Sequence, residues 1–380
     1  MAPTHASLRK LRRKIQQDGF LAAGVSSMET LYRREILPPV FRILADRQFV
    51  QILDEEELTE AANDVAQIEY EGTDESRRVF EVGEGTIVPE TGLCLAPGGR
   101  LVSASVSSPE YSERYTVETL ARTDVDVAPV TPKLLSKAEV FEDATEIEGP
   151  VCPLAPRYRN YYHWVVGTIP KIRYVERYEA LTGQEVTYIL PRDLPPWARE
   201  ILSLLGYSGE KFVAAKSDAY QTNQLIVPSH PFPGQREDYE WLRERVFDTL
   251  ELPAPASVKS IYISREKAVG RRVVNQDEVV RMLSEYGFEK YVLEDRNVRE
   301  NIALFAQADL VVSPHGAGLT DIMFCRDSSV VELFGARKNT AYEQLCSLLD
   351  FNHVALDCEA VSTDIRVDVG ELEDTVEQLY

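Results

Sequence analysis

The sequence predicts an α/β protein with two Rossmann-like domains that face a cleft, preceded by a helical and β-rich N-terminal accessory region. Three observations support this prediction. From Pro150 onward, short apolar runs rich in β-branched residues alternate with amphipathic stretches, which is typical of parallel sheets covered by helices. A segment rich in Pro, Ala and Ser at 252–260 separates two such series. The length of 380 residues also exceeds that of one ordinary core.

The first 140 residues lack this alternation. Residues 1–70 are predicted to be helical, with one helix over 54–68, whose acidic start suits the helix dipole. From about 76 to 140, short alternating stretches separated by Gly, Pro and Ser predict a small sheet layer. We therefore expect an accessory region over 1–70, a first Rossmann-like domain over 71–252 and a second over 253–380.

Each element of the α/β part follows from its own pattern. Short apolar runs predict strands, and stretches with apolar residues three or four positions apart predict helices. Before the linker, the expected elements are a helix over 161–183, a strand over 186–190, a helix over 195–207, a strand over 223–229 and a helix over 236–250. After the linker, they are strands over 260–264, 290–294, 309–314, 329–334 and 353–356, with helices over 275–287, 298–308 and 341–349 and one from Gly316.

The charge of the chain restricts its partners. Acidic residues number 62 against 41 basic ones, of which only 11 are lysines, and the net charge is −21. Such a surface repels nucleic acid, so we expect no nucleic-acid partner. A dense acidic surface with few lysines also fits a very salty cytoplasm, as in a halophilic archaeon, while a mildly acidic cytosolic protein is the alternative.

The compartment is predicted from cysteines and hydropathy. The five cysteines lie far apart without a CxxC pair, which indicates reduced and mostly buried thiols in a cytoplasmic protein. No apolar run approaches the roughly 18 residues of a membrane span. The basic stretch at 7–15 could touch the inner face of a membrane as a peripheral contact, although a frayed, solvated helix end is the favoured interpretation.

A turn of very small residues interrupts the apolar sequence VVSPHGAGLTDIMFCRDSSVVELF. If VVS ends a central strand, then Gly316, Ala317 and Gly318 open the next helix, where unpaired N–H groups and the helix dipole attract an anion. Thr320 adds a hydroxyl, and His315 adds a ring donor. A purely structural turn with an ordinary loop histidine is the alternative.

Arginines in the same half favour the anion site. Arg265 is predicted to follow a strand, and Arg271 with Arg272 to lie on a short loop, where guanidiniums near one sheet edge suit a diphosphate. Glu332 ends the next strand, a position where a carboxylate commonly accepts hydrogen bonds from ribose hydroxyls of a nucleoside. Arginines on a solvated loop and a salt-bridged Glu332 are the alternatives.

Together these stretches resemble glycosyltransferase family 61. They are NYYHWVVGTIPKI, YISREKAVGRRVVN with the following Glu278, VRENIALFAQADLVVSPHGAGLTDIMF and VVELF. The likeness covers roughly 150–356 and is most specific from Ala308 to Phe334. It implies a GT-B architecture whose C-terminal half binds the nucleotide. It also implies transfer from a nucleotide sugar with inversion and without a required metal or other cofactor.

One position departs from the family. The family pattern usually has Asn after Gly-Leu-Thr, whereas this chain has Asp321. Because a diphosphate would repel a neighbouring carboxylate, we expect Asp321 to turn away from the site.

Inverting transfer requires a base for the acceptor hydroxyl and cations for the leaving diphosphate. Arg265, Arg271 and the helix end at Gly316 are expected to supply the positive charge. We expect His163, on the wall opposite the donor, to be the base, because imidazole titrates near neutral pH.

Other assignments around His163 remain open. The histidine could instead pack on Trp164 to orient its helix, and Glu176 or Asp193 could be the base. Asn160 and Tyr162 are expected to shape the acceptor pocket.

The expected partners follow from this chemistry. The donor would be a nucleotide sugar, with UDP as the expected nucleotide, and the acceptor a hydroxyl of a glycan, lipid-linked glycan or protein in surface polysaccharide or glycoprotein assembly. No metal site is expected, since no HxxxH pair and no Cys/His cluster occur. A degenerate transferase that only binds a nucleotide sugar or glycan is the alternative function.

Overall fold

The computed structural model of the protein describes two compact α/β units. The described residues are 52–53, 65–69, 78–105, 144–156, 158–207, 209–229, 234–252, 259–336 and 338–379. Contacts group Met1–Arg157, Tyr174–Arg192 and Lys211–Phe232 into the first unit, and Tyr158–Arg173, Asp193–Glu210 and Pro233–Tyr380 into the second. The predicted basic segment at 7–15 lies outside the described residues.

The first unit is built on one mixed sheet. Its strands run in the order β1-β6-β5-β4-β10-β7-β8-β9, with β3 pairing both β2 and β10. Strands β10, β7, β8 and β9 are mutually parallel, and the others in the described part join them through antiparallel pairs and one parallel pair. The strands are β1 (Ile52–Leu53), β2 (Val65–Glu69), β3 (Arg78–Val82), β4 (Gly85–Val88), β5 (Leu93–Ala96), β6 (Arg100–Val102), β7 (Thr145–Pro153), β8 (Thr187–Leu190), β9 (Phe212–Ala214) and β10 (Tyr220–Pro228). Short 3₁₀ helices of this unit lie at η2 (Pro97–Gly99) and η3 (Ser103–Ser105), while η5 (Gly209–Lys211) is divided between the two units.

The β-rich prediction after residue 76 is confirmed where the structure describes it, but the helix over 54–68 is wrong at its end. Val65–Glu69 forms β2, whose Gln67 lies in register with Phe80 of β3. The sequence from Ala66 to Glu69 alternates apolar and polar residues, a pattern that favours a paired strand over the helix that its acidic surroundings suggest.

The second unit is a doubly wound parallel sheet. Its order is β12-β11-β13-β14-β15, and every neighbouring pair is parallel, as predicted. The strands are β11 (Lys259–Ile263), β12 (Glu289–Tyr291), β13 (Ala308–Pro314), β14 (Ser329–Phe334) and β15 (Asn352–Asp357), followed by the hairpin β16 (Glu359–Val361) and β17 (Asp364–Arg366).

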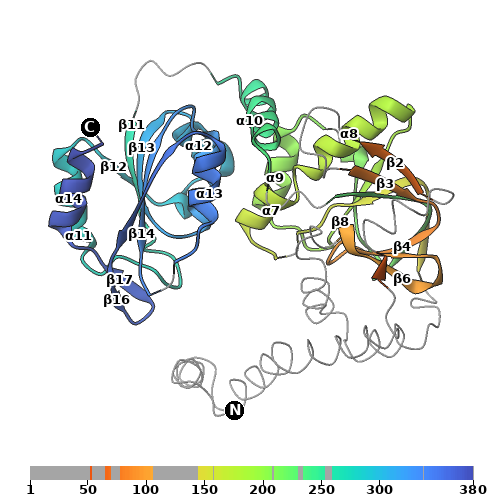
Figure 1. Cartoon of the computed structure of the whole chain (residues 1–380), viewed down its shortest axis with the longest axis horizontal. Helices are drawn as coiled ribbons and strands as arrows, with labels where there is room; N and C mark the ends of the chain where they lie inside the picture. Colours follow the sequence, from red (N-terminus) through yellow and green to blue (C-terminus); the bar gives the residue numbers. More distant parts are fainter. Residues whose placement is uncertain are drawn as a thin grey trace, which may run out of the picture. The chain divides into compact units, whose positions relative to one another are not determined.

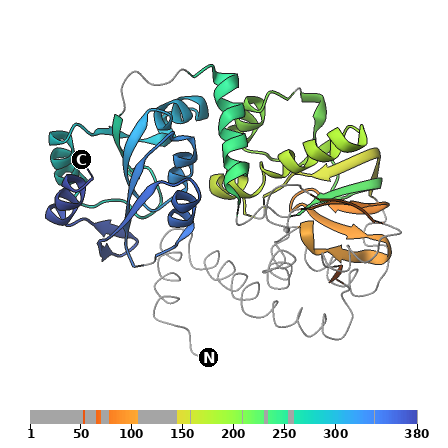
Figure 2. The ribbon, with the colours of Figure 1, turned by 45° about the horizontal axis from the view of Figure 1, so that its top comes forward.

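Helices cover both faces of this sheet (Figures 1 and 2). Helices α11 (Gln276–Glu285) and α14 (Val369–Glu377) lie on one face, and α12 (Val298–Phe305) and α13 (Ala341–Leu348) on the other. Val312 of β13 and Leu333 of β14 pack with α11 and α14. Because side chains alternate along a strand, Glu332 points to the opposite face, toward the α13 side.

Three further helices pack on the second unit although they precede the linker. They are α7 (Tyr161–Gly167), α9 (Pro196–Leu204) and α10 (Arg236–Leu250). The 3₁₀ helices η6 (Leu293–Asp295) and η7 (Ala317–Phe324) complete the unit. The predicted helix over 161–183 is two helices, α7 and α8 (Lys171–Thr182), because Pro170 interrupts the backbone hydrogen bonds between them. The domain boundaries at 70 and 252 stay predictions.

Candidate functional site

The candidate site lies at the carboxyl ends of β11 and β13. The chain crosses from β11 through α11 to β12 on one side, then returns through α12 to β13 on the other side of β11. The loops after β11 and β13 therefore leave in opposite directions, which is where doubly wound sheets bind their ligands. The first loop carries the predicted arginines, and the second carries His315–Gly318.

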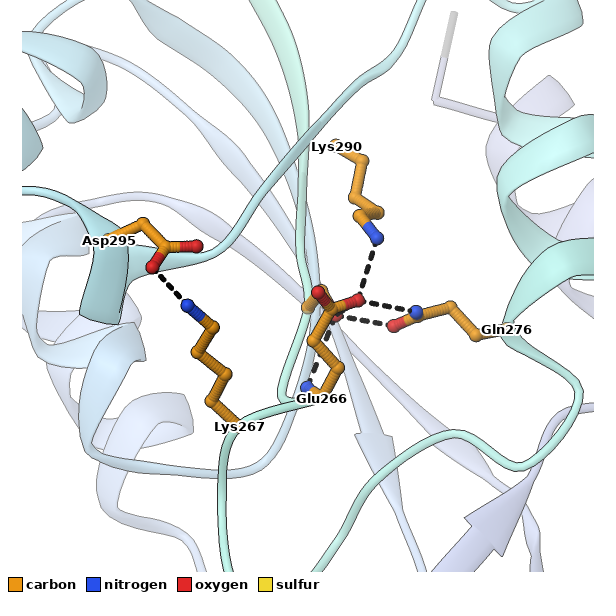
Figure 3. A network of polar contacts seen from close by, with 6 residues as sticks. Glu266, Lys267, Gln276, Lys290 and Asp295 are labelled. Atoms are coloured by element: carbon orange, nitrogen blue, oxygen red, sulfur yellow. Dashed lines mark hydrogen bonds and ion pairs between the residues drawn. The ribbon is translucent and has the colours of Figure 1, made fainter.

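Polar contacts hold the loop after β11 against the strand next to it (Figure 3). Lys290 of β12 donates to Glu266 (Nζ to Oε2, 2.7 Å), Gln276 donates to the same carboxylate (Nε2 to Oε2, 2.9 Å), and Lys267 pairs with Asp295. The residues directly after Arg265 are thus neutralised and fixed. Arg265 itself contacts the turn after β13.

The Arg265 guanidinium rests against Gly316. A β-carbon on Gly316 would lie 1.8 Å from Arg265 Nη1, so the guanidinium occupies the space that a side chain there would need. Nε and Nη2 of Arg265 donate to the Gly270 carbonyl at 3.4 and 3.3 Å. Burial, and then the charge of Arg271, lowers the pKa of Arg265. No ion pair with a described residue offsets this charge, so the site offers a half-buried cation to an anion.

The next two arginines differ in their contacts. Arg271 has a left-handed backbone (φ 59°), and its N–H donates to the Thr363 carbonyl at 2.6 Å. Arg272 is bound to Asp364, with Nη2 to Oδ2 at 2.7 Å. Arg271 is therefore the second cation that remains beside Arg265, whereas Arg272 is committed to the β16–β17 hairpin.

The glycine turn after β13 carries backbone N–H groups at the start of a short helix. Helix η7 is 3₁₀ and begins at Ala317, after Gly316 in the N-cap position. The Leu319 N–H donates to the Gly316 carbonyl, while the N–H groups of Ala317 and Gly318 have no acceptor among the described residues. Such donors suit an anion. Thr320 is fully buried instead, with its hydroxyl 3.4 Å from the Tyr342 hydroxyl.

Glu332 is fully buried between two histidines. Its Oε1 bonds to His315 Nδ1, and its Oε2 lies 2.8 Å from His353 Nε2. The His315 ring contacts the rings of Phe334 and Tyr342, with centroid distances of 5.4 and 5.5 Å. Both carboxylate oxygens thus have protein partners, and contact of Glu332 with a ribose stays a prediction.

His353 was missed from the sequence. It lies in a short apolar strand and has no motif around it, so only its register beside β14 reveals its partner. A histidine within a strand next to a strand that contains a buried-type position occupied by a glutamate was the available signal.

Helix α7 carries the predicted acceptor-side residues and belongs to the second unit, not to the first as the sequence had suggested. The Asn160 side chain caps it by accepting from the His163 N–H at 3.0 Å. The His163 ring contacts the rings of Tyr158 and Tyr162, with centroid distances of 4.6 and 5.2 Å. Tyr162 in turn meets Tyr342 edge-on at 5.5 Å, and burial raises the pKa of Tyr162 to about 12. Aromatic contacts therefore connect His163 with the residues around His315.

A second contact joins α7 to the glycine turn. The Tyr161 hydroxyl donates to Asp321 Oδ1 at 2.6 Å. Asp321 is only 2% exposed, and burial raises its pKa from 3.8 to about 7. Asp321 therefore sits inside the unit as a partner of Tyr161, a contact that the sequence did not predict.

The remaining predicted groups lie elsewhere. Glu176 is on α8 in the first unit, and Asp193 is an exposed residue of the second. In the described ranges, no group of three or more His, Cys, Asp or Glu residues could hold a metal ion. None of the described helices combines the length and hydropathy that crossing a membrane requires.

Comparison with known proteins gives one match. Residues 161–331 match the family model of glycosyltransferase 61, and they include α7, the loops after β11 and β13 and the first half of β14. A search of curated proteins found no match. The chain thus contains a region similar to glycosyltransferase 61, which supports its membership of that family and a function as a glycosyltransferase.

Proposed function

We propose that the protein is an inverting, metal-independent glycosyltransferase of GT-B architecture. It would transfer a sugar from a nucleotide sugar, with UDP as the expected nucleotide, to a hydroxyl of a glycan or glycoconjugate in surface polysaccharide or glycoprotein assembly. The observation that carries this proposal is the half-buried Arg265 guanidinium against Gly316, which forms no ion pair with a described residue and lies where the strand order of the sheet reverses.

The charges fit the leaving group of this reaction. When the glycosidic bond breaks, negative charge develops on the diphosphate, and donors already in place stabilise it without reorganisation. Arg265, Arg271 and the free N–H groups of Ala317 and Gly318 supply such donors. In this proposal they take the part that a divalent metal has in other transferases.

We propose His163 as the base that removes the proton of the acceptor hydroxyl. It stands in the first turn of α7, and aromatic contacts through Tyr162 and Tyr342 connect it with His315. Asn160 caps the same turn and would hold the imidazole in place for an acceptor that packs on Tyr162. A cytoplasmic location and adaptation to high salt complete the proposal.

Incubation with a panel of UDP-, GDP- and dTDP-sugars in molar KCl tests the function. One nucleotide class is expected to raise the melting temperature, and its sugar to be transferred with release of the nucleoside diphosphate. If no nucleotide or nucleotide sugar stabilises the protein, the proposal fails. Stabilisation without release in the presence of glycan acceptors would point to the binding-only alternative.

Arg271→Gln and Arg272→Gln form a matched pair at neighbouring positions. Arg271→Gln is expected to weaken UDP binding by about tenfold, because it removes one cation from a charge-assisted contact. Arg272→Gln should leave UDP binding within about twofold and cost less than about 1 kcal/mol of stability, since its ion pair is half exposed. Calorimetric titration with UDP measures both; equal losses in the two variants would contradict the assignment.

A further inference from the structure

We propose that Glu332 and His353 are positioning residues for His315. They hold its imidazole with the proton on Nδ1, so that Nε2 is the nitrogen left for the donor's phosphates. A neutral imidazole with its proton on Nδ1 has none on Nε2, so it can donate to a phosphate only after uptake of one proton from solvent onto Nε2. The identity of the ligand rests on the proposed function, whereas the tautomer of His315 does not.

The sheet itself builds this cluster. Glu332 lies in register with Ser313 of β13 and with Ala355 of β15. His315 comes two residues after Ser313, and His353 two residues before Ala355. Since residues two apart share a face of a strand, the three side chains meet on the α13 side of the sheet.

The hydrogen-bonding capacity of Glu332 sets the tautomer of His315. A carboxylate only accepts hydrogen bonds, so a ring nitrogen bonded to it must carry the proton. Oε1 accepts from His315 Nδ1 and Oε2 from His353 Nε2. Glu332 is fully buried, so bulk solvent does not reach either oxygen. The second nitrogen of His315, Nε2, has no hydrogen-bond partner in the described part of the chain, and 15% of the side chain is exposed.

The groups around His315 also favour an anion at Nε2. Among the described residues, the charged or titratable ones are Glu332 from β14, His353 from β15, Tyr342 and Cys346 from α13, Arg265 beside the adjacent Gly316, and Arg271. Burial raises the pKa of Tyr342, which therefore stays a neutral phenol. Of the described carboxylates, the one that bonds to the ring is Glu332, and it bonds to Nδ1. A phosphate that approaches Nε2 therefore does not compete with a carboxylate for that nitrogen.

Nitrogen NMR of histidine-labelled protein tests the tautomer without any nucleotide. Among the five histidines, His315 is assigned by the signals that disappear in His315→Asn. At pH 8.5 we expect a protonated Nδ1, whereas free histidine favours a protonated Nε2. A bare Nδ1 overturns the inference. A protonated Nδ1 in a protein that binds no nucleotide overturns the proposed function and leaves the arrangement of His315 standing.

Calorimetry of UDP binding in buffers of different ionisation enthalpy measures the proton. The wild-type protein is expected to take up about one proton per UDP at pH 8.5. In Glu332→Gln the amide N–H can donate to Nδ1, which places the single proton of the imidazole on Nε2 before UDP binds. Proton uptake on binding should therefore fall toward zero. The UDP affinity at pH 7 should fall by about tenfold, because the phosphate then meets a neutral donor instead of a charged one. Unchanged uptake and affinity in this variant contradict the role of Glu332.

Two variants separate positioning by His353 from simple packing. His353→Gln retains an N–H donor for Glu332 Oε2 and is expected to keep the His315 tautomer and UDP affinity within about twofold. His353→Leu fills similar space without a donor and is expected to lower proton uptake and affinity. If both variants behave alike, His353 has no positioning role.

Discussion

Asp321→Asn is expected to raise the free energy of unfolding of the second unit by about 4 kcal/mol at pH 8. Asp321 is buried on η7, and burial raises its pKa from 3.8 to about 7. Between these two values the folded carboxyl holds a proton that the unfolded chain has lost, so stability falls as the pH rises through this window. Above pH 7 the full cost of a buried carboxylate remains. Asn cannot ionise, so the free-energy cost of a buried carboxylate is absent from the variant. Its side-chain oxygen can still accept a hydrogen bond from the Tyr161 hydroxyl.

Chemical unfolding at pH 5.5 and pH 8 measures this difference. The difference in unfolding free energy between Asp321→Asn and the wild-type protein should grow by about 2 kcal/mol from pH 5.5 to pH 8. The rest of the difference is already present at pH 5.5, because this pH lies above the pKa of the unfolded carboxyl. Lower pH is avoided because 62 acidic residues then lose charge and solubility falls. All three tryptophans, Trp164, Trp197 and Trp241, belong to the second unit, so their fluorescence follows its unfolding alone.

Asp327→Asn is the matched control, six residues further along the chain and exposed. Its unfolding free energy should differ from that of the wild-type protein by the same small amount at both pH values. If Asp321→Asn raises the free energy of unfolding by the same amount at pH 5.5 and at pH 8, the stabilisation does not come from the ionisation of this carboxyl.

Most of the second unit's sheet could be predicted from the sequence because its strands are buried on both faces. Runs such as Leu310–Val312 and Val330–Leu333 are buried throughout and rich in valine, which is typical of parallel strands covered by helices on both faces. Strand β7 was not predicted, since Gly149 and Pro150 interrupt its pattern. The β16–β17 hairpin was not predicted either, because its residues are mainly polar and exposed.

The site was predictable where residues follow strand ends. Arg265 and Gly316 could be placed together because carboxyl ends of neighbouring parallel strands meet at one edge. Contacts that depend on register or on packing between distant segments were not predictable. Glu332 meets His353 only through the register of β14 with β15, and Tyr161 meets Asp321 across 160 residues of sequence.

The position of α7 shows the same limit. From sequence, Asn160 and His163 follow a strand of the first unit and were assigned to the wall opposite the donor. In the structure α7 packs on η7 within the second unit, because the apolar side of α7, with Trp164 fully buried, finds its partner surface there. Neighbourhood along the chain therefore predicted the helix but not the unit to which it belongs.

Gly316→Ala is expected to weaken UDP binding by about 10- to 100-fold while leaving the fold intact. The backbone of Gly316 is extended (φ 170°), so Ala adopts it without strain. Its methyl group would, however, lie 1.8 Å from Arg265 Nη1 and must push the guanidinium aside. The end of an arginine side chain moves at little cost, so the unfolding free energy should change by less than about 1 kcal/mol. Gly370→Ala on α14, where the nearest atom is 3.5 Å away, is the control.

A double-mutant cycle with Arg265→Gln shows whether the loss comes from the displaced guanidinium or from a damaged turn. If displacement is the cause, Ala at position 316 removes a contact that Gln at position 265 has already removed. The double variant should then bind UDP about as weakly as Arg265→Gln alone, which gives a coupling free energy on the order of 1–3 kcal/mol. Losses that add in full would mean that the two residues act independently, and that Ala at position 316 weakens binding through the N–H groups of the turn and not through the arginine.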